Sequence, residues 1–588
     1  MSTSSSIVDS ATEQAHSGAA RTMPSSQPAM MLLWCVVLCL IMGGRLQWRA
    51  EPSQPNDTFQ YYSVARNALE GRVGYTSIVH FDAERSFGTV PAPLVTFPVG
   101  YPLLLAALVA LGPTLDQAAV AINLLAAIAC VIVIATAARR LQLSRLATHA
   151  AVGGFVLNAA IAWWTTTAST ELVFTATITA AVLWLALPRR HESSPSTADA
   201  LVAGLLVGLS YYLRYAGLFV LVGLVAATVL AWLRPGRLRF RQYAAAALVS
   251  GFLMAAGLIR NLLIVGNWRG GNEKPAWHAP LAVGVDTIRA FDHLLLGDRS
   301  GVAQFAAHML WFAVVAAVVS MAVWFGRAGS EPVGRTQSAK VSDFVALTAT
   351  IMVVYSVCMF YASVTTVISY NSRMFVPMLP LTLILIACGL DAVRSRLSSI
   401  ARPMQLAAAG GIALLICGYV LLNVPRALSP VNNSRTERIR ASLFDDESTG
   451  QSAERVLRAT LGAHRRILAN DGQAIGHLSR IETVSLVSME YSKTAWTEGE
   501  LQNAASTFDV GAVVIRRPDS EEAEDADIVP SEFVMHLANL THPAWLVPVY
   551  VTDTLVIYQV NLASAANRLG ETPLLGLRPK TVARSADG

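Results

Sequence analysis

The sequence predicts an α-helical, polytopic membrane protein that ends in a small α/β soluble domain. Only 14% of its 588 residues are charged, whereas about 25% are charged in a typical soluble domain. Apolar residues make up 54% and the mean hydropathy is +0.47, so most of the chain requires an apolar solvent. The charges are concentrated near the C-terminus, where 36 of the last 159 residues are charged, against 47 of the first 429. This composition argues against a soluble enzyme and divides the chain into a membrane part and a soluble part.

Eleven apolar runs are candidate membrane spans, because about 20 helical residues cross the roughly 30 Å of bilayer hydrocarbon. They define a transmembrane domain over residues 29–425. The runs are Ala29–Leu46, Gln117–Ala138, Ala147–Trp164, Thr170–Leu187, Ala198–Leu213, Gly217–Leu233, Tyr243–Ile264, Gln304–Phe325, Phe344–Ser363, Phe375–Val393 and Leu406–Leu422.

A twelfth apolar segment, Pro98–Leu111, is too short to span and has prolines at its start, so we expect it to be re-entrant or interfacial. The distribution of Lys and Arg supports this interpretation, because short cytoplasmic loops carry most of them. With this segment left out of the count and the N-terminus inside, every basic short loop falls on the cytoplasmic side. These loops contain Arg139, Arg140 and Arg145; Arg189 and Arg190; Arg234, Arg237, Arg239 and Arg241; Arg327, Arg335 and Lys340; and Arg394, Arg396 and Arg402.

We expect the protein to lie in the cell membrane, and this topology assigns each remaining segment to the cytoplasmic or the outer side. Residues 1–28 form a disordered cytoplasmic leader, and the first span is an uncleaved anchor because its 18 residues exceed a signal-peptide core and no small-residue cleavage site is convincing. A first outer loop (residues 47–115), a second outer loop (265–303) and the chain after Asn423 face outward.

The outward-facing tail alternates strand-like and helix-like runs, which indicates a small α/β domain over residues 430–562, followed by a flexible tail over 563–588. The predicted strands are Arg466–Asn470, Thr483–Met489, Val510–Ile515, Trp545–Tyr550 and Leu555–Val560, and the predicted helices are Glu498–Phe508 and Ser531–Leu540.

No motif for a nucleotide or a metal is recognisable, since GxxxxGK[ST], GxGxxG, HExxH and GxSxG do not occur. Asp525-Ala526-Asp527 matches the DxD of nucleotide-sugar enzymes, but it stands within an acidic loop, which favours a solvated surface. All six cysteines lie in apolar runs without disulfide or metal spacing. We predict no cofactor and no nucleic-acid partner, and the sequence does not support a divalent metal.

Five charged residues stand out beside or within the spans: Asp57, Glu171, Arg214, Arg260 and Arg373. A charge in hydrocarbon costs at least about 2.5 kcal/mol on insertion scales, so such residues are functional candidates. Each also has an ordinary explanation, because an outer-loop Asp is commonly solvated, interfacial arginines snorkel to headgroups, and Glu171 could cap its helix. The topology, derived without these five residues, places all of them at the outer face. Together they suit a reaction in which a hydroxyl is deprotonated and an anionic leaving group, such as phosphate, is held by arginine.

A set of motifs in fixed order carries a family resemblance. The run Asp57–Gly71, with Tyr61-Tyr62 and Ala65-Arg66-Asn67, is followed by Phe97-Pro98-Val99-Gly100-Tyr101-Pro102, Glu171 with Leu172 and Phe174, Arg214-Tyr215-Ala216-Gly217, Arg260-Asn261, and Tyr370-Asn371-Ser372-Arg373 with Pro377. This order resembles the C-type glycosyltransferases (GT-C), which include protein O-mannosyltransferases and the lipid A aminoarabinose transferase. The resemblance covers roughly residues 30–425.

The resemblance implies that Asp57 is the catalytic base, that the segment 98–111 helps to shape the cavity, and that the donor is a polyprenyl-phosphate sugar. Tyr61 and Tyr370 join the three arginines as expected substrate-binding residues. Two departures matter. Many relatives have a second acidic residue where this chain has Asn56, and its absence argues against a metal site here. The Pro-Pro pair of these relatives is replaced by Pro98-Val99 in this chain.

We therefore predict a glycosyltransferase that moves a sugar to a hydroxyl of a glycan, lipid or protein acceptor at the outer face, in a single inverting displacement. Asp57 takes the hydroxyl proton, the arginines hold the departing lipid phosphate, and Glu171 orients the substrate or one of the arginines. One alternative is a transporter or flippase of a lipid-linked or anionic solute, which predicts charges near the bilayer midplane and broken helices in repeated halves. Another is a catalytically silent subunit whose outer domain recruits partners.

Overall fold

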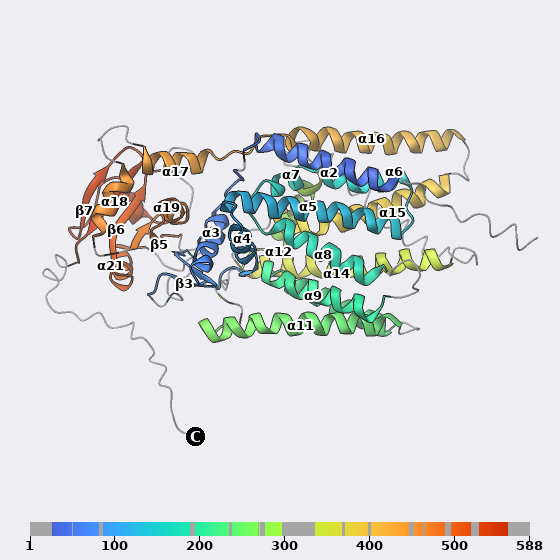
Figure 1. Cartoon of the computed structure of the whole chain (residues 1–588), viewed down its shortest axis with the longest axis horizontal. Coiled ribbons are helices and arrows are strands. Elements are labelled where there is room, and N and C mark those ends of the chain that lie inside the picture. Colours follow the sequence, from blue (N-terminus) through green and yellow to red (C-terminus); the bar gives the residue numbers. More distant parts are fainter. Residues whose placement is uncertain are drawn as a thin grey trace, which may run out of the picture.

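The structure is a computed structural model that describes residues 26–49, 51–80, 86, 88–187, 195–233, 238–268, 270, 277–296, 335–366, 371–397, 402–445, 452–462, 464, 466–487, 496–518 and 528–562. It consists of a bundle of long helices with an α/β body at one end (Figure 1). Most of the predicted leader, the predicted span Gln304–Phe325, and the tail 563–588 lie outside the described residues.

Apolar helices of roughly bilayer length build the bundle. Within the described ranges, six helices are long and apolar enough to cross a membrane: α2 (Ser26–Arg45), α5 (Leu115–Arg140), α11 (Leu238–Val265), α14 (Arg335–Thr365), α15 (Leu379–Leu397) with the 3-10 helix η4 (Ser372–Met378) before it, and α16 (Arg402–Ala427). The pair α6 (Arg145–Val156) and α7 (Ala159–Thr165) bends by 52° and can count as one broken span. Four shorter apolar helices within the described ranges are α4 (Gly100–Val109), α8 (Glu171–Ala186), α9 (Thr197–Leu213) and α10 (Gly217–Leu233). Each predicted span inside the described ranges overlaps one of these helices, and the total of eleven stays a prediction.

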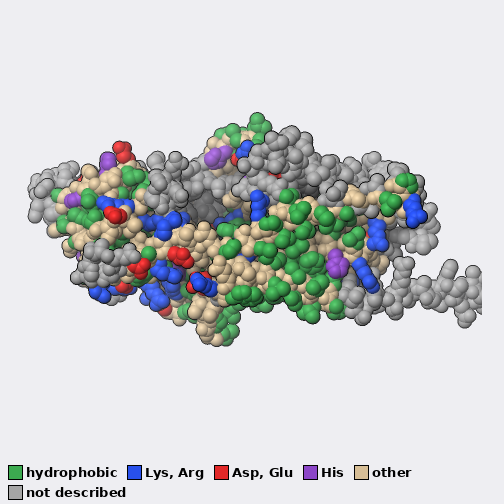
Figure 2. Space-filling view, turned by 90° about the horizontal axis from the view of Figure 1, so that it is seen from above, with side chains coloured by type: hydrophobic (Ala, Val, Ile, Leu, Met, Phe, Trp, Pro, Cys, Tyr) green, Lys and Arg blue, Asp and Glu red, His purple; other side chains and the backbone are tan. Residues whose placement is uncertain are grey.

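The surface of the bundle is that of a membrane protein. Hydrophobic side chains cover the flank that faces the viewer in Figure 2, whereas charged side chains gather over the α/β body and at the opposite end of the bundle. Helices pack closely where glycine permits it: a Cβ on Gly204 of α9 would come within 2.7 Å of the Ala246 carbonyl oxygen of α11. The multi-pass membrane architecture is therefore clear, while its orientation stays a proposal.

The segment predicted to be re-entrant forms the short helix α4 (Gly100–Val109), whose ten residues reach only about 15 Å at 1.5 Å per residue. It lies beside α3 (Asn56–Leu69) at the α/β end of the bundle (Figure 1). Its first residue must be small, because a Cβ on Gly100 would come within 2.5 Å of the Tyr212 carbonyl oxygen at the end of α9. The predicted second outer loop contains a further helix, α12 (Pro280–Leu296).

The α/β body contains a six-stranded sheet in the order β2-β5-β4-β6-β8-β7. Strands β2 (Ile78–Val79), β5 (Glu482–Ser485), β4 (Arg466–Ala469) and β6 (Val510–Arg516) are parallel, and β8 (Leu555–Val560) and β7 (Leu546–Val551) are antiparallel. The helices are α17 (Ser434–Phe444), α18 (Ala453–Leu461), α19 (Gly472–Ser479), α21 (Glu498–Thr507) and α22 (Glu532–Ala538). Every residue of β6 is buried, as expected of a parallel strand covered on both faces.

The five strands and two helices predicted for the tail each overlap an observed element, but the sheet extends beyond residues 430–562. Its edge strand β2 belongs to the first outer loop, which also forms a two-stranded ribbon of β1 (Tyr75–Thr76) and β3 (Ala92–Pro93). The place of this loop in the sheet could not be predicted from the sequence, because a two-residue strand is too short to show an alternation of apolar and polar residues.

Candidate functional site

Asp57 stands in the first turn of α3, where the partial positive charge of the helix N-terminus favours a carboxylate. The helix begins after Pro55, whose φ of −64° and extended ψ of 164° direct the chain into the first turn. The neighbouring Thr58 donates its hydroxyl to the Ala168 carbonyl oxygen over 2.7 Å. This contact holds the start of α3 next to the segment that leads into α8, and the Asp57 side chain keeps 21% of its surface exposed.

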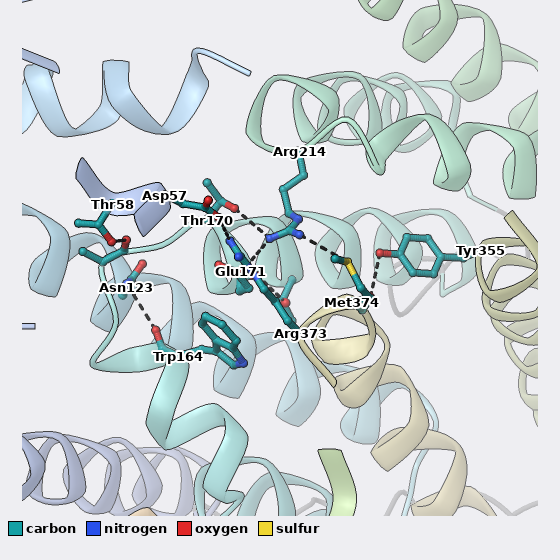
Figure 3. A network of polar contacts seen from close by, with 12 residues as sticks. Asp57, Thr58, Asn123, Trp164, Thr170, Glu171, Arg214, Tyr355, Arg373 and Met374 are labelled. Carbon is teal, nitrogen blue, oxygen red and sulfur yellow. Dashed lines mark hydrogen bonds and ion pairs between the residues drawn. The ribbon is translucent and has the colours of Figure 1, made fainter. Parts of the chain in front are cut away.

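Glu171 is the first residue of α8 and is fully buried. Two guanidinium groups surround its carboxylate: Nη1 of Arg214 and Nε of Arg373 both form ion pairs with its Oε1. Arg214 lies in an extended conformation where α9 ends, and its Nη1 also donates to the Thr170 hydroxyl over 3.2 Å. Arg373 comes from η4, and its Nη2 lies 2.6 Å from Oδ2 of Asp57. Arg373 therefore links the two acids (Figure 3).

Four of the five predicted charged residues thus form one cluster of two carboxylates and two guanidiniums, which we call the ion-pair cluster (Asp57, Glu171, Arg214 and Arg373). Formal charges within it cancel, which offsets the desolvation cost of burying them. The second oxygen of Glu171, Oε2, is buried and has no hydrogen-bond partner in the described part of the chain. Glu171 thus pairs with both arginines and is inaccessible, whereas the Asp57 side chain is partly exposed.

Uncharged residues complete the surroundings of the cluster. The Arg373 guanidinium carbon lies 5.4 Å from the ring centre of Trp164, in cation–π range. Arg214 points Nη2 at the sulfur of Met374 over 3.9 Å, and the Tyr355 hydroxyl donates to the Met374 carbonyl oxygen over 3.0 Å (Figure 3). Their place beside the cluster cannot be predicted from the sequence, because an aromatic residue or a methionine in an apolar segment carries no signal that distinguishes it from a core residue.

The remaining predicted site residues are placed differently. Arg260 donates from Nη1 and Nη2 to the Leu94 carbonyl oxygen, each over 3.2 Å, and among the described residues it forms no hydrogen bond or ion pair with the ion-pair cluster. Tyr61 is buried and packs edge-on against the rings of Phe97 and Tyr101, at 5.6 and 5.4 Å between centroids. Tyr370 lies outside the described residues. The substrate-binding roles predicted for these three residues stay predictions.

A metal site is not evident, since no group of three or more His, Cys, Asp or Glu residues that could hold an ion occurs among the residues described. The ion-pair cluster itself supplies two carboxylates, but both are paired with guanidinium groups. Its chemistry is that of a base beside cations, which can accept a proton and bind an anion.

No protein-family model and no curated protein sequence matches the chain. Among solved structures, apo ArnT of Cupriavidus metallidurans is similar over 92% of this chain and 99% of its own, with a TM-score of 0.54 at 11% identity. ArnT bound to undecaprenyl phosphate is similar over the same shares, with a TM-score of 0.51 at 11% identity. The oligosaccharyltransferase AglB of Archaeoglobus fulgidus, in complex with an inhibitory peptide and a dolichol-phosphate, is similar over 94% of this chain and 76% of its own, with a TM-score of 0.52 at 13% identity. These likenesses confirm the predicted GT-C-like fold.

Proposed function

We propose that this GT-C-like protein is a glycosyltransferase that uses a polyprenyl-phosphate sugar as donor and an acceptor hydroxyl at the outer face of the membrane. The observation that carries the proposal is the ion-pair cluster, in which a partly exposed carboxylate, Asp57, pairs with Arg373, and a buried acid, Glu171, holds both Arg373 and Arg214. Similar folds occur in proteins solved with dolichol-phosphate and undecaprenyl phosphate, which supports a lipid-phosphate ligand for this chain as well.

The proposed reaction is one inverting displacement. The acceptor oxygen attacks the anomeric carbon and loses its proton to Asp57, while the bond from that carbon to the phosphate oxygen breaks. The products are the glycosylated acceptor and the polyprenyl phosphate, with the proton left on Asp57. General-base catalysis of this kind contributes about 10²- to 10⁴-fold in rate.

Arg373 and Arg214 are assigned to the leaving phosphate. A guanidinium carries five N–H donors, and the ion pairs use Nε and Nη2 of Arg373 and Nη1 of Arg214, so each arginine keeps donors for a phosphate oxygen. Glu171 is fully buried and engaged by both arginines, so it acts as their holder and does not contact the acceptor. Of the two roles predicted for Glu171, we propose orientation of the arginines.

The proposed orientation places the ion-pair cluster and the α/β body on the outer side and the N-terminus in the cytoplasm. Its support is the positive-inside pattern of the sequence together with the position of α3 and α4 at the same end of the bundle as the α/β body (Figure 1). A midplane transport site would need its charges in the middle of the bundle, whereas Asp57 belongs to a helix at one end.

The experiment is a transfer assay on purified protein in lipid, with a panel of radiolabelled polyprenyl-phosphate sugars and a membrane extract as acceptor. Wild type is compared with Asp57→Asn and with a matched control, Asp509→Asn, at an exposed acid of the α/β body. Transfer by wild type and the control, lost in Asp57→Asn, supports the proposal. No transfer from any donor, with lipid bound or moved equally by all three proteins, would favour the transporter; equal transfer by all three would remove the base assignment.

A further inference from the structure

The helix that carries Asp57 is attached to the membrane domain at its first turn and again one turn later, where Tyr61 packs against Tyr101 of α4 and the Tyr62 hydroxyl donates to Oδ1 of Asp116 in α5 over 2.7 Å. Besides the bond from Thr58 to Ala168, the backbone of Ser53 just before α3 pairs with the segment that precedes Glu171. The Ser53 amide donates to the Thr166 carbonyl oxygen over 2.8 Å, and the Ala168 amide donates to the Ser53 carbonyl oxygen over 3.0 Å. These bonds fix where α3 starts.

A second, adjoining face of α3 packs on α19 of the α/β body. The His477 ring lies between two aromatic rings of α3, 5.2 Å from the centroid of Phe59 and 5.4 Å from that of Tyr62. One turn further, Nη1 of Arg66 donates to the His477 carbonyl oxygen over 3.2 Å. Phe59 is 2% exposed and belongs to the hydrophobic core of the α/β body, although it is only two residues from Asp57.

The chain beyond α3 is also built into the α/β body. The Gln60 side-chain amide donates to the Ile78 carbonyl oxygen over 3.0 Å, which connects α3 directly to the edge strand β2. Ile78 pairs with Thr483 and Val79 with Val484, so β2 lies parallel to β5. The α/β body therefore holds α3 by a helix contact on one side and by the strand that follows it.

We propose that the α/β body positions the base Asp57, and that His477 is the positioning residue through which it sets the tilt of α3. Among the described residues, His477 forms no hydrogen bond or ion pair with the ion-pair cluster, so its effect on Asp57 is transmitted through α3. This inference rests on the proposed function for its catalytic consequence, whereas the seating of α3 by His477 stands independently of it.

The way in which the His477 ring packs against α3 predicts which substitutions of this residue are tolerated. His477 is 9% exposed, and its Nδ1 is buried without a hydrogen-bond partner among the described residues. The ring therefore fills space between Phe59 and Tyr62 as an apolar group, a role that Phe can take over and Ala cannot. A displacement of about 1 Å at a catalytic group costs up to about 10²-fold in rate.

The test compares His477→Ala, His477→Phe and a matched control at an exposed histidine of the same body, His536→Ala. Two readouts are taken on the full chain in lipid: kcat and KM for the donor, and amide hydrogen exchange of residues 56–69. We expect His477→Ala to lower kcat by about tenfold or more, with donor KM unchanged, and to speed exchange in α3 by about tenfold. His477→Phe and His536→Ala should match wild type on both readouts.

Wild-type kcat and wild-type exchange in His477→Ala would overturn the inference, and so would an equal loss in His477→Phe, because packing would then not be the cause. In an Asp57→Asn background, His477→Ala should lower the residual rate no further, whereas a purely structural role would add its own loss. If His477→Ala fails to fold, Arg66→Met, which removes only the donor to the His477 carbonyl, must shift both readouts in the same direction or the inference fails. If even wild type transfers no sugar, the proposed function fails, and the exchange data alone decide whether His477 seats α3.

Discussion

Replacing Glu171 by Gln tests the holder role most sharply, because it removes one negative charge and little volume. The carboxylate forms ion pairs with Arg214 and Arg373 and is fully buried, whereas the two arginine side chains are 16% and 21% exposed. A hydrogen bond to a charged group contributes about 1.5–3 kcal/mol, so two contribute about 3–6 kcal/mol. Gln keeps an acceptor oxygen and the arginines are partly solvated. We therefore expect the free energy of unfolding to fall by about 3 kcal/mol, the lower end of this range.

That loss predicts a lower unfolding temperature of the membrane domain for Glu171→Gln. We also expect kcat/KM for the donor to fall by up to about 100-fold, because arginines that the carboxylate no longer holds are displaced, and a displacement of about 1 Å at a catalytic group costs up to about 10²-fold in rate. The measurements are thermal unfolding and donor kinetics in lipid, with Glu437→Gln at an exposed acid of α17 as the matched control. Adding Arg214→Met should recover part of the stability, since Arg214 is the guanidinium left without a counter-charge, whereas Arg373 keeps its ion pair with Asp57. Wild-type stability and kinetics in Glu171→Gln would refute the holder role.

Three further outcomes are expected. Arg373→Lys should lower donor kcat/KM by about 10- to 100-fold, because one ammonium cannot bridge Asp57 and Glu171 as the guanidinium does; unchanged kinetics would contradict this. Arg260→Met, measured in the same assay, should cost less than Arg373→Lys, because Arg260 is bound to the Leu94 carbonyl outside the cluster. Burial, reinforced by nearby arginines, lowers the pKa of His477 to about 3, so the folded chain stays neutral there while the unfolded chain binds a proton below about pH 6.5. The stability of the α/β body should therefore fall as the pH drops from about 6.5 toward 3, and His477→Phe should remove that part of the pH dependence in unfolding curves.

The features that the sequence predicted well are those with a strong local cause. Apolar length predicts a span by itself, and the segment Pro98–Leu111 is excluded as a span because its apolar run is too short to cross a bilayer, in agreement with the ten-residue helix α4 that it forms. Asp57, Glu171, Arg214 and Arg373 could be selected together because a charge beside hydrocarbon is costly unless it is paired. Arg260 satisfied the same criterion, yet it binds a backbone carbonyl, a partner that leaves no trace in the sequence.

The features that could not be predicted from the sequence depend on contacts between distant parts of the chain. Strand β2 has only two residues and gains its place from β5, about 400 residues later, so no local alternation marks it. Nothing in the local sequence distinguishes His477 from other histidines, because its role depends on the packing of α19 against α3. The boundary of the soluble domain, drawn from charge density, therefore left out the loop that completes its sheet.

The central claim, that Asp57 is the base for sugar transfer from a polyprenyl-phosphate donor, is tested most directly by a single-turnover measurement. Wild type and Asp57→Asn are loaded with the same donor in lipid, the bound donor is counted, and the first turnover is timed after acceptor is added. We predict equal donor binding and a rate about 10²- to 10⁴-fold lower in Asp57→Asn. Equal rates at equal occupancy would contradict the claim.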